Sequence, residues 1–90
     1  MARKRRNKNK RVSLKIVERK LGKENAVGLH WPGDHLIEID PRQTSREYLD
    51  TLIHESLHEI FPNASETTIM RAAGTITDVL WRCNYRRIMK

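Results

Sequence analysis

Two histidines separated by three residues, with a glutamate directly after the first, form the segment of this chain best suited to chemistry. The segment reads His54-Glu55-Ser56-Leu57-His58. On a helix, residues four apart lie about 40° apart in projection and one turn along the axis, so both imidazoles can reach one metal ion. The carboxylate of Glu55 projects to a neighbouring face, where it can take a proton from a water molecule that the metal activates. The pattern predicts one zinc ion held by His54 and His58, with Glu55 as general base.

The sequence around this segment independently predicts the helix that such a site requires. Thr44 and Glu47 have the spacing of a capping box, which starts a helix, and Pro62 stops one. Apolar residues recur between them at helical spacing: Leu49, Leu52, Ile53, Leu57 and Ile60. We therefore expect a helix from the capping box to about Phe61.

A catalytic zinc ion needs a third protein ligand and an open fourth position. We expect Glu66 in this role, because a second helix starting after residues 62–65 would run back and bring Glu66 beside His58. The alternative is that Glu66 only serves the start of that helix, where the dipole favours an acid and Asn63 has capping-box spacing. The reserve ligands are His30, His35, Asp78 and Cys83, of which the two hairpin histidines are more typical of structural roles and Cys83 is expected in the core.

The rest of the chain predicts a small sheet and a second helix. Val12, Leu14 and Ile16 alternate with polar residues and favour a strand, although residues 14, 17 and 21 also fit a helix. Two β-prone runs at 26–31 and 35–40 flank Pro32-Gly33-Asp34 and predict a β-hairpin. The predicted fold class is α+β, a short antiparallel sheet of about three strands packed on two helices. The second helix, capped by Asn63 or Ser65, would bury a stripe made of Ile69, Ala72, Ala73, Ile76, Val79 and Leu80.

The positive charge is concentrated at the N-terminus. Seven of the 18 Lys and Arg residues lie in the first eleven positions, which leaves 11 basic against 11 acidic residues in the remainder. They are Arg3, Lys4, Arg5, Arg6, Lys8, Lys10 and Arg11. We expect residues 1–11 to form a flexible basic arm and residues 12–90 to form the domain. Such an arm can contact the phosphates of a nucleic acid, or it can be a solubilising or targeting tail.

The composition excludes several classes of protein. Hydrophobic residues make up 38% and charged residues 32%, and no apolar run approaches the roughly 20 residues that span a bilayer. The basic N-terminus lacks the apolar stretch of a secretory signal. The single cysteine, Cys83, cannot form an internal disulfide, which fits the reducing cytoplasm. We expect a cytoplasmic protein with no membrane partner.

From about Val12 to Arg87 the chain resembles small zincin-like metallopeptidases of phages and bacteria, and more loosely SprT-like and minimal gluzincin domains. The resemblance is carried by Ile39-Asp40-Pro41-Arg42, the stretch from Leu49 to His58, Ser65-Glu66, Leu80-Trp81-Arg82 and Tyr85-Arg86-Arg87. It implies a zinc cofactor, His54, His58 and Glu66 as ligands, Glu55 as base, and the host cytoplasm if a phage encodes the protein. Longer gluzincins place the third ligand further downstream, and SprT-like proteins use a histidine, whereas this chain has none after His58.

Two functions follow as hypotheses. The first is a zinc-dependent metallopeptidase-like hydrolase whose peptide substrate adds as a strand to the hairpin edge. Tyr48 and Tyr85 are the tyrosines available as oxyanion donors, with packing as the alternative role. The second is a small nucleic-acid-binding protein, in which zinc braces the fold and the arm contacts phosphates. Four protein ligands would indicate a structural zinc, and an open position beside Glu55 would favour catalysis.

Overall fold

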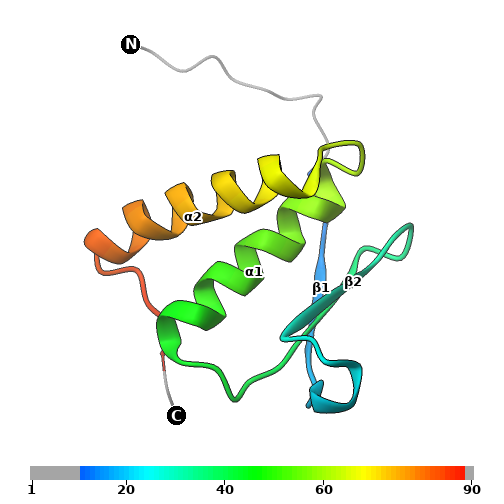
Figure 1. Cartoon of the computed structure of the whole chain (residues 1–90), viewed down its shortest axis with the longest axis horizontal. Coiled ribbons are helices and arrows are strands. Elements are labelled where there is room, and N and C mark those ends of the chain that lie inside the picture. The colour runs from blue at the N-terminus through cyan, green and yellow to red at the C-terminus, as the bar shows by residue number, and fades with distance from the viewer. Residues whose placement is uncertain (1–10, 89–90) are drawn as a thin grey trace.

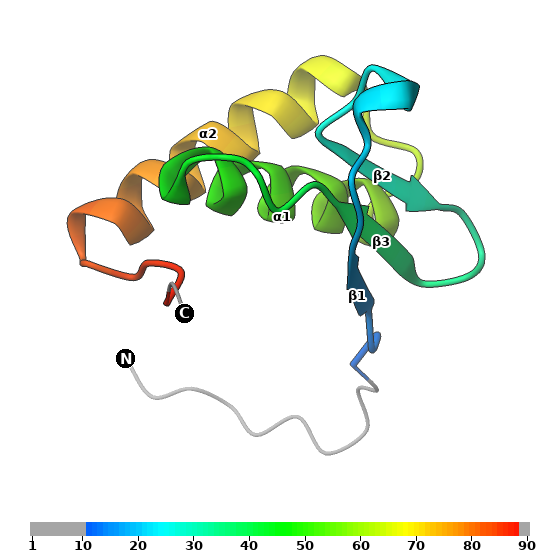
Figure 2. The same cartoon turned by 90° about the horizontal axis from the view of Figure 1, so that it is seen from below.

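The computed structural model of the chain describes residues 11–88 and contains three strands and two helices. The elements, in chain order, are β1 (Lys15–Glu18), a short 3-10 turn (Gly22–Glu24), β2 (Gly28–Trp31), β3 (Leu36–Ile39), α1 (Ser45–Ile60) and α2 (Glu66–Arg82). Figures 1 and 2 show α1 between α2 and the sheet, and α1 contacts α2, β2 and β3. The predicted α+β class, with three strands and two helices, is confirmed. Of the predicted basic arm, residues 1–10 lie outside the described residues, and Arg11 is exposed.

The predicted capping box starts α1. The Thr44 side chain accepts a hydrogen bond from the Glu47 backbone N–H at 3.2 Å, and the Thr44 backbone N–H donates to the Glu47 carboxylate at 3.1 Å. The hydrogen bonds that the Glu47 carboxylate accepts from the side chain and backbone of Thr44 hold the pKa of Glu47 below its usual range. At the other end, the Phe61 N–H donates to the Leu57 carbonyl at 2.8 Å, and Pro62 cannot continue the helix. The helix that carries the His-Glu-x-x-His segment therefore has the predicted limits.

The predicted hairpin forms, and the sheet is mixed. β2 and β3 pair antiparallel, and the turn between them uses positive φ angles at Gly33 (85°) and His35 (50°). β1 pairs parallel with β3, so the strand order is β1-β3-β2 and the sheet differs from the wholly antiparallel one expected. The reason is that the chain leaves β1, crosses the end of β3 and enters the sheet again on the far side of that strand.

The buried carboxylate of Asp40 stabilises the segment that crosses the end of β3. Asp40, 5% exposed, accepts the Leu21 backbone N–H at 2.9 Å and the Arg42 backbone N–H at 3.0 Å. The Arg42 guanidinium also donates to it, at 2.7 Å and 2.9 Å. The Arg42 side chain, followed by the two backbone donors, holds the pKa of Asp40 well below its usual range. Leu21, which is fully buried, is thereby fixed at the end of β3.

The core is small and lies on two sides of α1, where this helix packs against the sheet and against α2. Its buried apolar side chains are Leu21, Ile37, Ile39, Tyr48, Ile69 and Ala73. The expected buried stripe of α2 is therefore right for Ile69 and Ala73 but wrong for Ile76 and Val79, which are 39% and 44% exposed. Only the face of α2 toward α1 is covered, because α2 makes no element contact with the sheet in the described part of the chain. Within residues 11–88, no helix combines the length and apolar character needed to cross a membrane.

Candidate metal centre

A tight turn between the two helices brings Glu66 to the two histidines of α1. The Ala64 N–H donates to the Phe61 carbonyl at 3.1 Å, which closes the turn. Ser65 is the N-cap of α2, and its side chain accepts the Thr68 N–H at 3.1 Å. Of the two predicted caps, Ser65 is thus the one used. Glu66 follows in the first turn of α2.

Three potential ligand atoms converge at this point. The Nε2 atoms of His54 and His58 lie 3.2 Å apart. One carboxylate oxygen of Glu66 lies 2.8 Å from Nε2 of His54, and the other lies 2.6 Å from Nε2 of His58. All the ligand atoms of this group lie within 4.8 Å of one another. The structure therefore brings together the three residues that the sequence predicts as ligands.

The donor set and its spacing fit a zinc ion. Tetrahedral zinc with bonds of about 2.0–2.1 Å separates its ligand atoms by roughly 3.3 Å. The two histidine nitrogens, at 3.2 Å, already have this spacing. The Glu66 side chain is 63% exposed, against 18% and 17% for His54 and His58, so the carboxylate has room for the small outward movement that an ion requires. Two imidazoles and one carboxylate are also a donor set that catalytic zinc uses.

Glu55 lies beside this cluster, at the edge of a small cavity. The cavity has a volume of about 260 Å³ and is lined by Val27, Asp50, Thr51, His54, Glu55 and Met70. Glu55 and the candidate ligand His54 thus share one cavity.

Gly28 at the start of β2 allows the sheet to approach this part of α1 closely. A Cβ atom at position 28 would lie 2.5 Å from the Thr51 methyl carbon and 3.1 Å from Cγ of Glu55. Thr51 is buried and β-branched, so its side chain has little freedom to move away. The lack of a side chain at Gly28 therefore leaves the space that the side chains of Thr51 and Glu55 occupy.

We predict that Gly28→Ala lowers the free energy of unfolding by about 1–3 kcal/mol, the usual cost of overpacking a close contact. Urea unfolding of the purified proteins measures this difference. Gly74→Ala is the matched control, because a Cβ at Gly74 in α2 meets nothing within 4 Å. That change should stabilise the helix by up to about 1 kcal/mol. An unfolding curve for Gly28→Ala equal to that of the parent would show that β2 and α1 do not pack closely at position 28.

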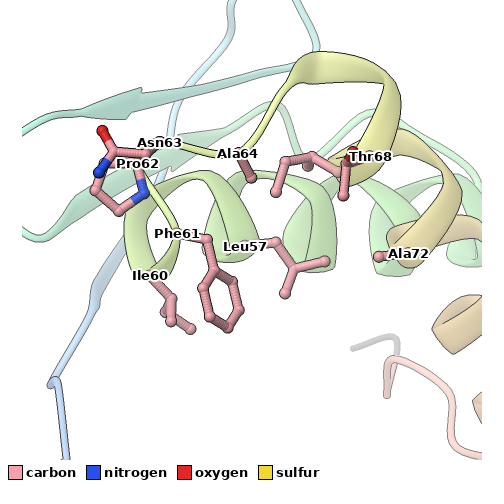
Figure 3. Close-up of a pocket in the computed structure, with 9 residues that line it drawn as sticks. Leu57, Ile60, Phe61, Pro62, Asn63, Ala64, Thr68 and Ala72 are labelled. Carbon is pink, nitrogen blue, oxygen red and sulfur yellow. The ribbon is translucent and has the colours of Figure 1, made fainter.

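A larger cavity, of about 590 Å³, lies under the turn between the helices and is not part of the metal centre. Leu57, Ile60 and Phe61 project toward it from the same side of α1 (Figure 3). None of the three candidate ligands lines it, and its walls hold no titratable side chain. It is an apolar hollow that the thin core leaves open.

Among the reserve ligands, only His30 lies next to the cluster. Its ring lies parallel to that of His58, with the two centroids 5.2 Å apart. His35 is 55% exposed and contacts Glu59. Asp78 pairs with Arg46 near the C-terminal half of α2. Cys83 is exposed at the C-cap of α2, so its expected place in the core is wrong.

The two tyrosines considered as oxyanion donors lie away from the cluster. The Tyr48 hydroxyl donates to Glu18 at 2.7 Å, and burial, followed by this bond, raises the pKa of Tyr48 to about 12. The Arg87 guanidinium lies over the Tyr48 ring and also pairs with Glu18 at 2.8 Å. Tyr85 is 65% exposed. Tyr48 therefore joins the C-terminal segment to β1.

Glu59 is the residue near the site that the sequence pattern did not single out. Its side chain is 3% exposed and lies 3.1 Å from Nδ1 of His30 and 3.5 Å from Nδ1 of His35. The sequence features that could have indicated this contact are the position of Glu59 directly after His58 and the two histidines that flank the hairpin turn.

Comparisons with protein-family models, with curated proteins and with solved structures find no match to this chain. The resemblance to zincin-like metallopeptidases stays a prediction that rests on the residues quoted for it. The candidate metal centre rests on its own geometry and donor chemistry.

Proposed function

We propose that this chain is a zinc-dependent metallopeptidase-like hydrolase. The observation that carries the proposal is the convergence of His54, His58 and Glu66 on one point, with Glu55 on the adjoining cavity. When bound, zinc would polarise a substrate carbonyl and lower the pKa of a water molecule toward neutrality. Glu55 would accept a proton from that water and later return a proton to the leaving amine.

The number of donors favours catalysis over a structural zinc. Structural zinc sites are usually closed by four protein ligands, whereas a catalytic site keeps one position free. In residues 11–88 the group of candidate ligands has three members. The exposed side of the cluster, where Glu66 lies, would leave the fourth position open to water and substrate.

The free edge of β2 supports a peptide as the substrate. Within residues 11–88, the strand order β1-β3-β2 leaves one side of β2 without a partner strand, and β2 packs against α1. An extended peptide that paired with this edge would gain main-chain hydrogen bonds. It would then lie beside the helix that carries Glu55.

Digestion of a peptide library tests the proposal. We expect the purified parent protein to cleave peptides, to lose the activity when zinc is removed with a chelator, and to regain it when zinc is added back. Mass spectrometry of the products would also give the residues preferred around the cleaved bond. Stoichiometric zinc binding without cleavage of any peptide would contradict the peptidase proposal while leaving the metal centre standing.

A further inference from the structure

The carboxylate of Glu59 is buried and plays no part in the metal centre described above. Glu59 follows His58 on α1, and its side chain is turned toward the β2–β3 hairpin. Oε2 lies 3.1 Å from Nδ1 of His30, which is placed to donate a hydrogen bond to it. A carboxylate removed from water needs such partners, because an unpaired buried charge is costly. The contact therefore fixes His30 on β2 against α1.

The ring of His30 in turn lies parallel to the ring of a candidate ligand. The two imidazole planes of His30 and His58 differ by only 2°, and their centroids are 5.2 Å apart. His30 is 27% exposed and His58 is 17% exposed, so both rings are partly enclosed. By contrast, the rings of His54 and His58 are tilted by 55°. A rotation of the His58 ring away from the metal point would have to displace the parallel ring of His30.

This contact takes the place of a hydrogen bond that metal-binding histidines usually make. A ligand histidine commonly donates its second ring N–H to a carboxylate or a carbonyl, which fixes the orientation of the ring. Among residues 11–88, neither His54 nor His58 makes a hydrogen bond through Nδ1. The carboxylate of Glu59 reaches the neighbouring histidine instead, and the plane of that ring is parallel to the plane of the His58 ring.

We propose that His30 and Glu59 are a positioning pair, in which Glu59 holds the His30 ring and that ring fixes the orientation of His58 for zinc. The proposal rests on the zinc binding proposed above. His30 acts through His58 and is not itself a ligand, because its ring nitrogens are not among the grouped ligand atoms and Nδ1 is engaged by Glu59. The zinc affinity of the site would thus depend partly on a residue of the β-hairpin.

Metal affinity of three hairpin variants tests this pair. Zinc and cobalt dissociation constants are measured by competition with a chelator for the parent, His30→Ala, His30→Phe and His35→Ala. We expect His30→Ala to weaken binding about 10–100-fold, as for other residues that support metal ligands. His30→Phe should restore only part of the affinity, because phenylalanine keeps a flat ring parallel to His58 but cannot donate a hydrogen bond to Glu59. His35→Ala is the matched control, since His35 contacts the same carboxylate but is 55% exposed.

The visible spectrum of the cobalt-loaded proteins supplies a second readout. His30→Phe should keep the parent spectrum, because the same three ligands surround the metal. A loss of affinity in His30→Phe as large as in His30→Ala, with a changed spectrum, would show that His30 is a ligand and overturn the proposal. Binding by the parent with unchanged affinity in His30→Ala would overturn it alone. Absence of zinc binding by the parent would overturn the proposed function as well.

Discussion

Glu55→Gln is expected to lower kcat for peptide hydrolysis by about 10²–10⁴-fold, the usual contribution of a general base, while zinc stays bound. Glutamine has nearly the same size and shape as glutamate, so it should keep the packing of this side chain beside Gly28. Its amide cannot accept the proton of the attacking water. Rates measured at saturating peptide, together with zinc content by elemental analysis, check both halves of the expectation.

The control for this variant makes the same chemical change far from the cluster. Glu24→Gln removes a carboxylate that pairs with Arg19 on the exposed surface, so its kcat should equal that of the parent. A Glu55→Gln protein that cleaves as fast as the parent would rule out Glu55 as the base. A variant that loses both activity and zinc would instead assign Glu55 to metal binding.

Zinc should stabilise the folded parent protein, and His58→Ala should remove this effect. A ligand that binds only the folded state adds about 2.7 kcal/mol at 100 times its dissociation constant. For a domain of this size that corresponds to a rise of roughly 10–20 °C in Tm. His58→Ala removes one of three ligands, so we expect its zinc affinity to fall by more than about 100-fold. Thermal unfolding with and without zinc measures the change.

Two controls separate a metal centre from a cluster of ion pairs. The carboxylate of Glu66 would also be attracted to protonated histidines, and such a pair would form without any metal. In that case zinc would leave the Tm of the parent unchanged, which would remove the basis of the proposed function. His35→Ala should keep the full zinc-dependent rise, because His35 lies outside the group of candidate ligands.

Elements whose contacts are local along the chain could be predicted from the sequence. The capping box at Thr44 and Glu47 and the stop at Pro62 define α1, because helix ends depend on hydrogen bonds between residues three or four apart. The common face of His54 and His58 follows from the helical repeat alone. The hairpin turn at Pro32-Gly33-Asp34 was also predictable from the sequence, since its geometry depends on the residues within it.

Most contacts between those elements could not be predicted from local patterns. The pairing of β1 with β3 in parallel comes from the path of the chain around Leu21 and Asp40, which no local pattern encodes. Ile76 on α2 is exposed because, among the described residues, the sheet packs on α1 and does not contact α2. The approach of Glu66 to the histidines, and of His30 to His58, joins residues from different elements. Such contacts depend on the packing of whole elements. Spacing along the chain predicted the approach of Glu66 to the histidines but gave no sign of the contact between His30 and His58.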